Sequence, residues 1–285
     1  MLKHRLLFGT LMILTFTGIV VFDGYLDGSA TMTKADDREI QGTLFAALTM
    51  LLIVVSQLEL SKLAAARNLK AFTPVTTIAS ILLACTWYVP QFIDVSAGLH
   101  MSLILAFALL GFILYQYLYY GTAGVLANCG LNCLSVVYLG VLSGFALAIR
   151  IEFGLWPLLM YIFVVKFSDV GAYAIGSLCG KHKFSPQVSP SKTWEGMAGA
   201  VGAAMIVALA FALVFGIMPG WSAVVFGLCF AFIGQLGDLA ESMMKRDAEL
   251  KDSANKLPGF GGILDVIDSP LAAAPFAYLF FVLVR

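Results

Sequence analysis

Long apolar runs separated by short polar or Gly/Pro-containing breaks dominate this chain, and they predict its secondary structure. Nine runs approach the roughly 20 residues that a helix needs to cross the hydrocarbon core of a membrane. They are residues 6–22, 44–58, 75–88, 99–119, 131–149, 155–168, 197–216, 223–236 and 270–284. The second, third and sixth runs are short, so we expect their helices to extend into flanking residues. The pattern predicts an all-α integral membrane protein of about nine transmembrane helices.

Composition supports this prediction and excludes a water-soluble protein. Hydrophobic residues make up 60% of the 285 residues, charged residues make up 12%, and the mean hydropathy is +0.93. A soluble domain carries about 25% charged residues, which it needs to cover its surface. The net charge is zero, so nothing indicates a nucleic-acid partner.

The distribution of lysine and arginine predicts the orientation. With nine spans and a cytoplasmic N-terminus, 12 cationic residues fall on the cytoplasmic side, 4 fall outside, and Lys166 lies near a membrane boundary. Cytoplasmic loops of membrane proteins carry such an excess of Lys and Arg. The N-terminal run lacks a small-residue cleavage site, so we interpret it as a retained helix. We expect two regions: N-terminal transmembrane helices in residues 1–150, and a second transmembrane region in residues 151–285, where the polar residues are concentrated in cytoplasmic segments at 169–196 and 238–268.

The polar segment 238–268 concentrates charge next to the membrane. It contains seven acidic and four basic residues. Asp238, Glu241 and Lys245 have i, i+3, i+7 spacing, so they share one face of a helix that continues the eighth apolar run. Asp265 and Asp268 form an i, i+3 pair just before the ninth run.

Pro258-Gly259 and Gly261-Gly262 lie between these two acidic groups, where they break the helix and allow close approach of backbone to a ligand. Clustered carboxylates suit Mg²⁺, which binds through one or two carboxylates and substrate phosphates. Adjacent cations suit the remaining phosphate charge. The segment therefore favours a Mg²⁺–polyphosphate site, while a solvated, salt-bridged loop remains the alternative.

The second polar segment, 169–196, combines glycines, lysines and hydroxyls. Asp169 directly follows the sixth run, and Ser191, Lys192 and Thr193 lead into the seventh. Hydroxyls and lysines at a helix start suit phosphate recognition. Ser191 or Thr193 could instead simply cap that helix. We interpret His182, between two lysines, as a phosphate donor or surface residue rather than a metal ligand.

At these two segments the chain resembles the CDP-diacylglycerol synthases, also called phosphatidate cytidylyltransferases. The family signature is Ser-x-x-Lys-Arg, four residues, Lys-Asp, then Pro-Gly-His-Gly-Gly and Asp-Arg-x-Asp. At that spacing this chain has Ser242, Lys245, Arg246, Lys251, Asp252, Pro258, Gly259, Gly261, Gly262, Asp265 and Asp268. Phe260 and Val266 replace the signature His and Arg. The resemblance covers roughly residues 155–285, and the first half is similar only in being a set of apolar helices.

The resemblance implies transfer of a cytidylyl group from CTP to phosphatidate in phospholipid biosynthesis, with Mg²⁺ as cofactor, in a bacterial cytoplasmic (inner) membrane. It implies catalytic roles for Asp238, Lys245, Arg246, Lys251, Asp252, Asp265 and Asp268. It implies that the Mg²⁺ ligands are Asp238, Asp265, Asp268 and Glu241. It implies substrate binding by Asp169, Lys181, His182, Ser189, Ser191, Lys192, Thr193, Glu195, Ser242, Gly259, Gly261 and Gly262.

Other functions stay open from sequence. One is a related transferase, either a CTP-dependent polyprenol kinase or an ether-lipid cytidylyltransferase. Another is a transporter whose acids line an ion path, although only Lys166 and Asp169 approach mid-span positions. A third is a non-catalytic relative, because Phe260 and Val266 remove polar groups from the signature. A homodimer and a self-packed helical bundle are both compatible with the sequence.

Overall fold

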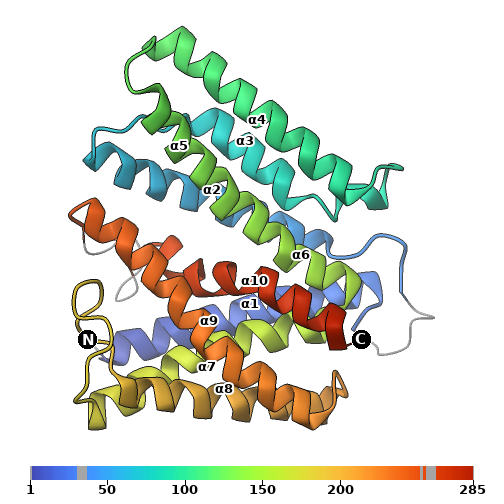
Figure 1. The fold of residues 1–285 in the computed structure, drawn as a ribbon. Helices are drawn as coiled ribbons and strands as arrows, with labels where there is room; N and C mark the ends of the chain where they lie inside the picture. The colour runs from blue at the N-terminus through green and yellow to red at the C-terminus, as the bar shows by residue number, and fades with distance from the viewer. Residues whose placement is uncertain (1, 31–36, 251–252, 255–260, 285) are drawn as a thin grey trace. The chain divides into compact units, whose positions relative to one another are not determined.

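The computed structural model consists of helices and the segments that connect them (Figure 1). It describes residues 2–30, 37–250, 253–254 and 261–284, with the side chains of residues 2–7 left out. Within these ranges there is no β-strand, and Lys183 and Thr193 form an isolated antiparallel bridge. The helices are α1 (Leu2–Asp27), α2 (Thr43–Ala66), α3 (Thr73–Ala84), α4 (Ala97–Tyr120), α5 (Val125–Val136), α6 (Leu142–Glu152), α7 (Leu155–Cys179), α8 (Trp194–Phe215), α9 (Gly220–Asp247) and α10 (Leu264–Val284).

The all-α membrane architecture expected from sequence is confirmed. In the described part of the chain, eight helical segments are long and apolar enough to cross a membrane. One of them, Val125–Glu152, combines α5 and α6 with the π-helical turn η3 (Val137–Val141) and corresponds to the fifth predicted run. The third predicted run forms α3, which is apolar but has only 12 residues. The protein is therefore an integral membrane protein, and its described residues form eight or nine helices able to span a membrane.

Several helices are longer than the apolar runs that predicted them. α1 continues to Asp27, α7 to Cys179 and α9 to Asp247. Asp27, Asp169 and Lys245 lie beyond the apolar runs and have partners in the protein, so these helices need not stop where hydrophobicity stops. As a result Asp23 and Asp27, which follow the first apolar run, and Asp169, which follows the sixth, lie within helices.

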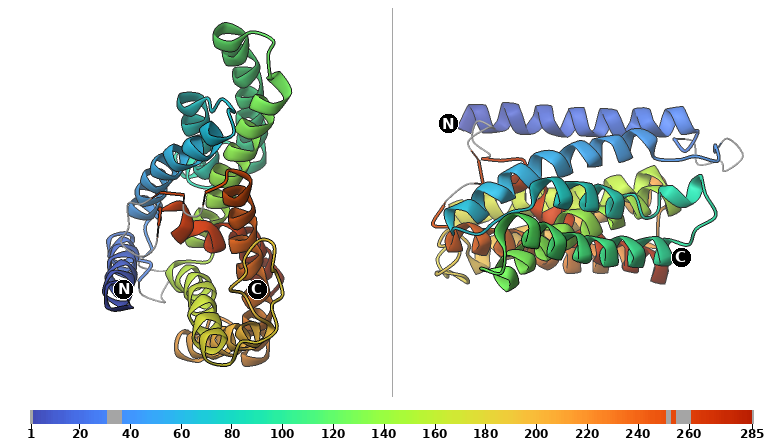
Figure 2. Two further views of the ribbon diagram at one scale, coloured as in Figure 1. Left: turned by 90° about the vertical axis from the view of Figure 1, so that its left-hand side faces the viewer. Right: turned by 90° about the horizontal axis from the view of Figure 1, so that it is seen from above.

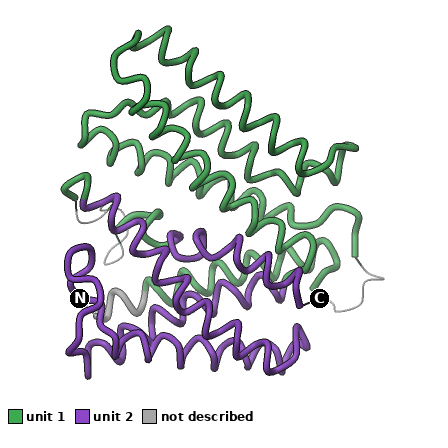
Figure 3. Tube along the Cα trace, viewed as in Figure 1, with its two compact units in different colours: residues 1–155, 247–266 green, residues 156–246, 267–285 purple. Residues whose placement is uncertain are grey.

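The chain divides into two compact units (Figure 3). Unit 1 comprises residues 1–155 and 247–266, and unit 2 comprises residues 156–246 and 267–285. Helix α10 begins in unit 1 and continues in unit 2.

In unit 1, α3 packs against both α2 and α4, as the views in Figures 1 and 2 agree. The core here is formed around Phe72, which is fully buried together with Leu83 and Phe112. The backbone before α3 is satisfied by amides from α5: Asn132 Oδ1 accepts from Phe72 N at 2.7 Å, and Asn128 Oδ1 accepts from Lys70 N at 3.0 Å. Such side chains satisfy backbone groups that cannot find water in a membrane.

A buried ionic group ties α1 to α6 in unit 1. Arg150 is fully buried, and its guanidinium donates to Asp23 Oδ2 at 3.0 Å and to Asp27 Oδ2 at 2.7 Å. The same carboxylates accept from the start of α2, from Leu44 N and Gly42 N. The predicted topology assigns these three charged residues to the same side of the membrane, and the structure brings them into contact.

In unit 2, close helix contacts depend on small residues. A Cβ on Gly199 of α8 would lie 2.5 Å from the carbonyl oxygen of Gly171 in α7. A Cβ on Gly227 of α9 would lie 2.5 Å from Met205 Cα in α8. Small residues allow helix backbones in membranes to approach this closely, which gains van der Waals contact without a hydrophobic driving force.

Candidate active site

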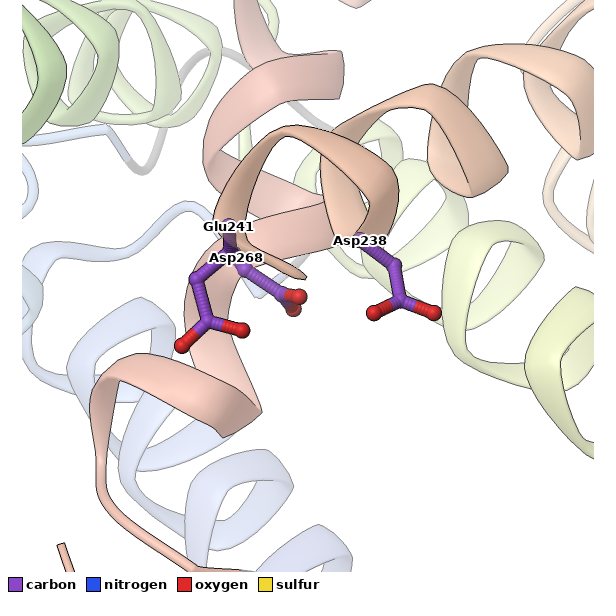
Figure 4. Close-up of side chains that lie close together, drawn as sticks. All are labelled: Asp238, Glu241 and Asp268. Carbon is purple, nitrogen blue, oxygen red and sulfur yellow. The ribbon is translucent and has the colours of Figure 1, made fainter. Parts of the chain in front are cut away.

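Three carboxylates of unit 2 gather where α9 meets α10. Asp238 and Glu241 lie on α9 and Asp268 lies on α10 (Figure 4). One oxygen of each lies within 4.8 Å of the others. Glu241 is fully buried and Asp268 is 3% exposed, whereas the Asp238 side chain is 35% exposed. The group is thus open to solvent or ligand at Asp238 and closed at the other two residues.

Local sequence explains how α9 and α10 come so close. Gly237, next to Asp238, has no side chain, and a Cβ there would lie 2.8 Å from Ala272 Cβ and 3.0 Å from Ser269 Cα. The helical spacing of Asp238 and Glu241 places them on one face, as the sequence predicted. Glycine at the crossing and acids on the facing side together bring the three carboxylates into one group.

Two lysines offset the negative charge of this group. Lys192 Nζ lies 2.7 Å from Asp238 Oδ2 and donates to the carbonyl oxygen of Gln235 at 3.2 Å. Lys245 forms an i, i+4 ion pair with Glu241, and only 8% of Lys245 is exposed. Ser242 Oγ donates to Asp238 Oδ1 at 3.3 Å. Three neighbouring carboxylates would repel one another strongly without such cations.

Asp169 of α7 connects to the same end of α9 through a glutamine. Gln235 Nε2 donates to Asp169 Oδ1 at 3.0 Å, and Lys166 Nζ lies 3.6 Å from Asp169 Oδ2. The sequence had singled out Asp169 for substrate binding but not Gln235. Gln235 carries no charge and lies inside an apolar run, so only its helical register with Asp238 could have pointed to it.

The loop between α7 and α8 folds back on itself. Trp194 N donates to the carbonyl oxygen of His182 at 2.9 Å, and Phe184 N donates to that of Lys192 at 3.2 Å. Arg246 of α9 reaches the same loop, with its Nε 3.4 Å from the carbonyl oxygen of Val188. These bonds hold Lys192 at the end of a closed loop, from which its ammonium group contacts Asp238.

The polar residues that open α8 have structural partners. Thr193 Oγ1 accepts from Gly196 N at 3.1 Å, so Thr193 is the N-cap of α8, which is the simpler of the two interpretations of this residue. Glu195 accepts from the backbone N–H groups of Lys181 and His182, each at 3.1 Å, and from His182 Nδ1 at 2.6 Å. His182 is therefore engaged by Glu195 rather than by the three carboxylates.

The predicted metal ligand Asp265 belongs to a different set of contacts, in unit 1. Asp265 Oδ2 accepts from Gly262 N at 2.7 Å, from Ser253 Oγ at 2.7 Å and from Ser253 N at 3.1 Å. Gly261 adopts φ +89°, a conformation that favours glycine. Three of the four predicted metal ligands thus form one group, and the group does not include Asp265.

The remaining predicted site residues are distributed as follows. Ser191, Lys181 and Arg246 are exposed and Ser189 is partly exposed. Lys251, Asp252 and Gly259 lie outside the described residues, as does Phe260. The roles proposed for all of these residues stay predictions.

Comparison with known proteins places the chain in a family. The sequence profile of the cytidylyltransferase family matches residues 3–284. A phosphatidate cytidylyltransferase of Bacillus subtilis (strain 168) is 40% identical over 152 residues, which are 52% of this chain and 56% of that protein. A phosphatidate cytidylyltransferase of Brucella suis is 41% identical over 128 residues, which are 45% of this chain and 47% of that protein. A phosphatidate cytidylyltransferase of Haemophilus influenzae is 40% identical over 131 residues, which are 44% of this chain and 46% of that protein.

The chain therefore spans about half the length of the curated relatives that it matches. The family profile, in contrast, extends across the N-terminal helices, where the sequence motifs had suggested only a general similarity. This chain belongs to the cytidylyltransferase family.

Proposed function

We propose that this protein transfers a cytidylyl group from CTP to phosphatidate, giving CDP-diacylglycerol and pyrophosphate. The observation that carries the proposal is the group of Asp238, Glu241 and Asp268 with Lys192 and Lys245 beside it. Family membership and the names of the relatives agree with this chemistry. The reaction brings two anions together, and this arrangement of acids and cations is suited to that problem.

We infer that the three carboxylates hold Mg²⁺. Their donor set consists only of oxygen atoms, which hard cations prefer, and the partial exposure of Asp238 leaves room for water and phosphate ligands. When bound, Mg²⁺ would neutralise phosphate charge and help orient the reacting groups. Asp265, whose carboxylate accepts from Ser253 and Gly262, would instead support the turn at Gly261 and Gly262, here called the glycine turn.

The reaction needs no nucleophile from the protein. An anionic phosphate oxygen of phosphatidate attacks the α-phosphorus of CTP, and a new phosphorus–oxygen bond forms. The bond from that phosphorus to the oxygen shared with the β-phosphate breaks, and pyrophosphate leaves with the electron pair. Phosphatidate is already anionic at neutral pH, so no general base is required. The tasks left to the protein are positioning and charge neutralisation.

Lys192 and Lys245 would neutralise phosphate charge from positions that their ion pairs with Asp238 and Glu241 define. Arg246, which is exposed, would provide a further cation at the end of α9. The loop before α8 would contact the nucleotide or the lipid phosphate through Ser191 and Lys181. We place the protein in a bacterial cytoplasmic membrane, where CTP arrives from the cytoplasm and phosphatidate from the bilayer.

The test is an assay in native membranes with CTP labelled at the α-phosphate, with phosphatidate, and with or without Mg²⁺. We expect label in CDP-diacylglycerol, release of pyrophosphate and complete dependence on the divalent cation. Release of labelled CDP would instead identify a CTP-dependent lipid kinase. Absence of any CTP-dependent product with phosphatidate, ether lipids or polyprenol would contradict enzymatic function.

A further inference from the structure

A buried carboxylate on the second helix reaches the C-terminal signature segment. Glu59 lies on α2 and is fully buried. Its Oε2 accepts from Leu264 N at 2.9 Å and from Ser253 Oγ at 3.3 Å. Glu59 and Leu264 are 205 residues apart in the chain, and both belong to unit 1. An acid from the N-terminal helices is thus part of the structure around the glycine turn.

Leu264 is the first residue of α10, so Glu59 occupies the N-terminal end of that helix. Backbone N–H groups in the first helical turn have no partner within the helix, and the helix dipole favours an anion there. Glu59 supplies both the acceptor and the negative charge. Glu59 lies on a different helix, whereas the side chain that caps a helix usually belongs to the residue just before that helix.

Ser253 links Glu59 to Asp265. Its hydroxyl lies within hydrogen-bond distance of both carboxylates, 3.3 Å from Glu59 Oε2 and 2.7 Å from Asp265 Oδ2. Gly262 completes the group, because its N–H donates to Asp265 Oδ2 at 2.7 Å. A side chain at Gly262 would collide with the Glu59 carboxylate and the Ser253 hydroxyl. The backbone N–H groups of Gly262 and Leu264 are therefore held by two different acids.

Stability alone does not account for an acid at this position. Burying a carboxylate costs several kcal/mol, and replacing buried ionic groups by apolar residues of similar volume is often neutral or stabilising. Acids inside transmembrane segments are therefore associated with function. By comparison Gln57, two residues earlier on α2 and also buried, accepts from Ser135 Oγ on α5 at 2.7 Å, a bond between helices that does not involve the glycine turn.

We propose that Glu59 is a positioning residue for cytidylyl transfer, whose carboxylate sets the conformation of the glycine turn and the start of α10. This inference rests on the proposed function, because the turn carries Gly261, Gly262 and Asp265 of the family signature. Glu59 acts through the backbone N–H of Leu264 and through Ser253, and not by contact with the reacting groups.

The test compares Glu59→Gln with Gln57→Met. Glu59→Gln keeps the size of the side chain but removes its charge, and hydrogen bonds to charged groups are the stronger ones. We expect Glu59→Gln to lower kcat by about 10-fold or more, with the KM for CTP changed less. We also expect faster hydrogen exchange in the peptide covering residues 261–266 and unchanged exchange elsewhere. Gln57→Met, which removes a buried hydrogen bond from the same helix, should leave both readouts near wild type.

Wild-type kcat and wild-type exchange in Glu59→Gln would overturn the inference. Equal losses in Glu59→Gln and Gln57→Met, with exchange raised throughout the protein, would also overturn it, since they would mean a general stabilising role. If the wild-type protein makes no CDP-diacylglycerol, the proposed function fails, while the local exchange measurement still decides whether Glu59 holds the turn.

Discussion

The charged groups of the two units differ in their exposure: the group around Arg150 in unit 1 is buried, whereas the group around Asp238 in unit 2 is partly exposed. In unit 1, Arg150 is fully buried and donates to Asp23 and Asp27. The same two carboxylates also accept hydrogen bonds from backbone N–H groups at the start of α2. In unit 2, Asp238 is partly exposed although Asp268 and Glu241 beside it are buried. A closed ionic group suits a structural role, whereas an open group of acids suits a ligand that carries positive charge.

The open group leads to a prediction for Asp268. Asp268→Asn keeps the shape of the side chain and removes one negative charge, so it should reduce Mg²⁺-dependent CDP-diacylglycerol formation on the order of 100-fold or more. The melting midpoint in detergent should change little. Asp94→Asn, at an exposed acid in the loop before α4, is the matched control and should be fully active. Chelation with EDTA should abolish the activity of the wild type and the control, and added Mg²⁺ should restore it.

Lys192 supports the same group from the loop before α8. Lys192→Met removes the cation but retains most of the apolar stem, so Asp238 loses its partner at 2.7 Å. If Asp238 holds Mg²⁺ as proposed, kcat/KM for CTP should fall by roughly 10- to 100-fold, the usual effect of losing a partner of a metal ligand. Lys183→Met, in the same loop but exposed, serves as control. Equal activity of the two variants would argue against a role for Lys192.

At the scale of helices, close packing in unit 2 depends on where glycines face a neighbour. Gly199 faces Gly171 and Ile175 of α7 with no space for a methyl group, whereas a Cβ at Gly202, three residues later on α8, would meet nothing within 4 Å. The two glycines are alike in sequence context and differ in their surroundings. Backbone approach is needed at one position and not at the other.

This contrast gives a matched pair of substitutions. Gly199→Ala should destabilise the protein by about 1–3 kcal/mol, because a methyl group must push against the backbone oxygen of Gly171. Gly202→Ala should be neutral or stabilise by about 0.5–1 kcal/mol, since alanine is the better helix former. Thermal unfolding in one detergent measures both. The same melting midpoint for the two variants would show that the α7–α8 contact is not tight at Gly199.

The helices were largely predictable from sequence, because long apolar runs in a chain with so few charges leave little alternative to membrane helices. Their ends were less predictable: α1 and α7 extend past the apolar runs, since Asp27 and Asp169 find partners that are distant in sequence. Asp238, Glu241 and Asp268 were predicted to bind metal from spacing and family resemblance. Glu59 was not predicted, since it follows the apolar run at residue 58 and its partners come 194 and 205 residues later.

At the scale of the whole molecule, the protein is a set of membrane helices, and Arg150 in unit 1 is a fully buried cation. Arg150 and its partners link α1, α2 and α6. Much of the surface of α1 is otherwise exposed in the protein, with large apolar side chains such as Leu14 and Phe22 accessible. The ionic group is therefore a principal attachment of the first helix to the rest of unit 1.

Arg150→Met should accordingly destabilise the protein by about 3–5 kcal/mol, because two carboxylates would remain buried without their cation. Replacing the acids as well, in Asp23→Asn/Asp27→Asn/Arg150→Met, should recover much of this loss, since neutral amides can still accept the backbone N–H bonds. Unfolding midpoints of the single and triple variants provide the comparison. A triple variant less stable than Arg150→Met would contradict the explanation.

The orientation predicted from lysine and arginine can be tested on intact cells. In a variant without the five native cysteines, Ser191→Cys and Asp94→Cys place single thiols at exposed loop positions. A membrane-impermeant maleimide should label Asp94→Cys from outside the cytoplasmic membrane and should label Ser191→Cys only after permeabilisation. The reverse pattern would mean that the positive-inside bias misassigns this protein.

The bond between Glu59 and Leu264 has a consequence for modularity. The signature motifs all lie in the C-terminal half, which invites the view that this half is a portable catalytic unit and the first helices a replaceable anchor. A chimaera that takes its first helices from an unrelated membrane protein would retain every signature residue but lose the acid at the start of α10. Exchange of N-terminal helices between members of the family should be tolerated only where the donor supplies an equivalent carboxylate, so the two halves of the gene are expected to evolve together.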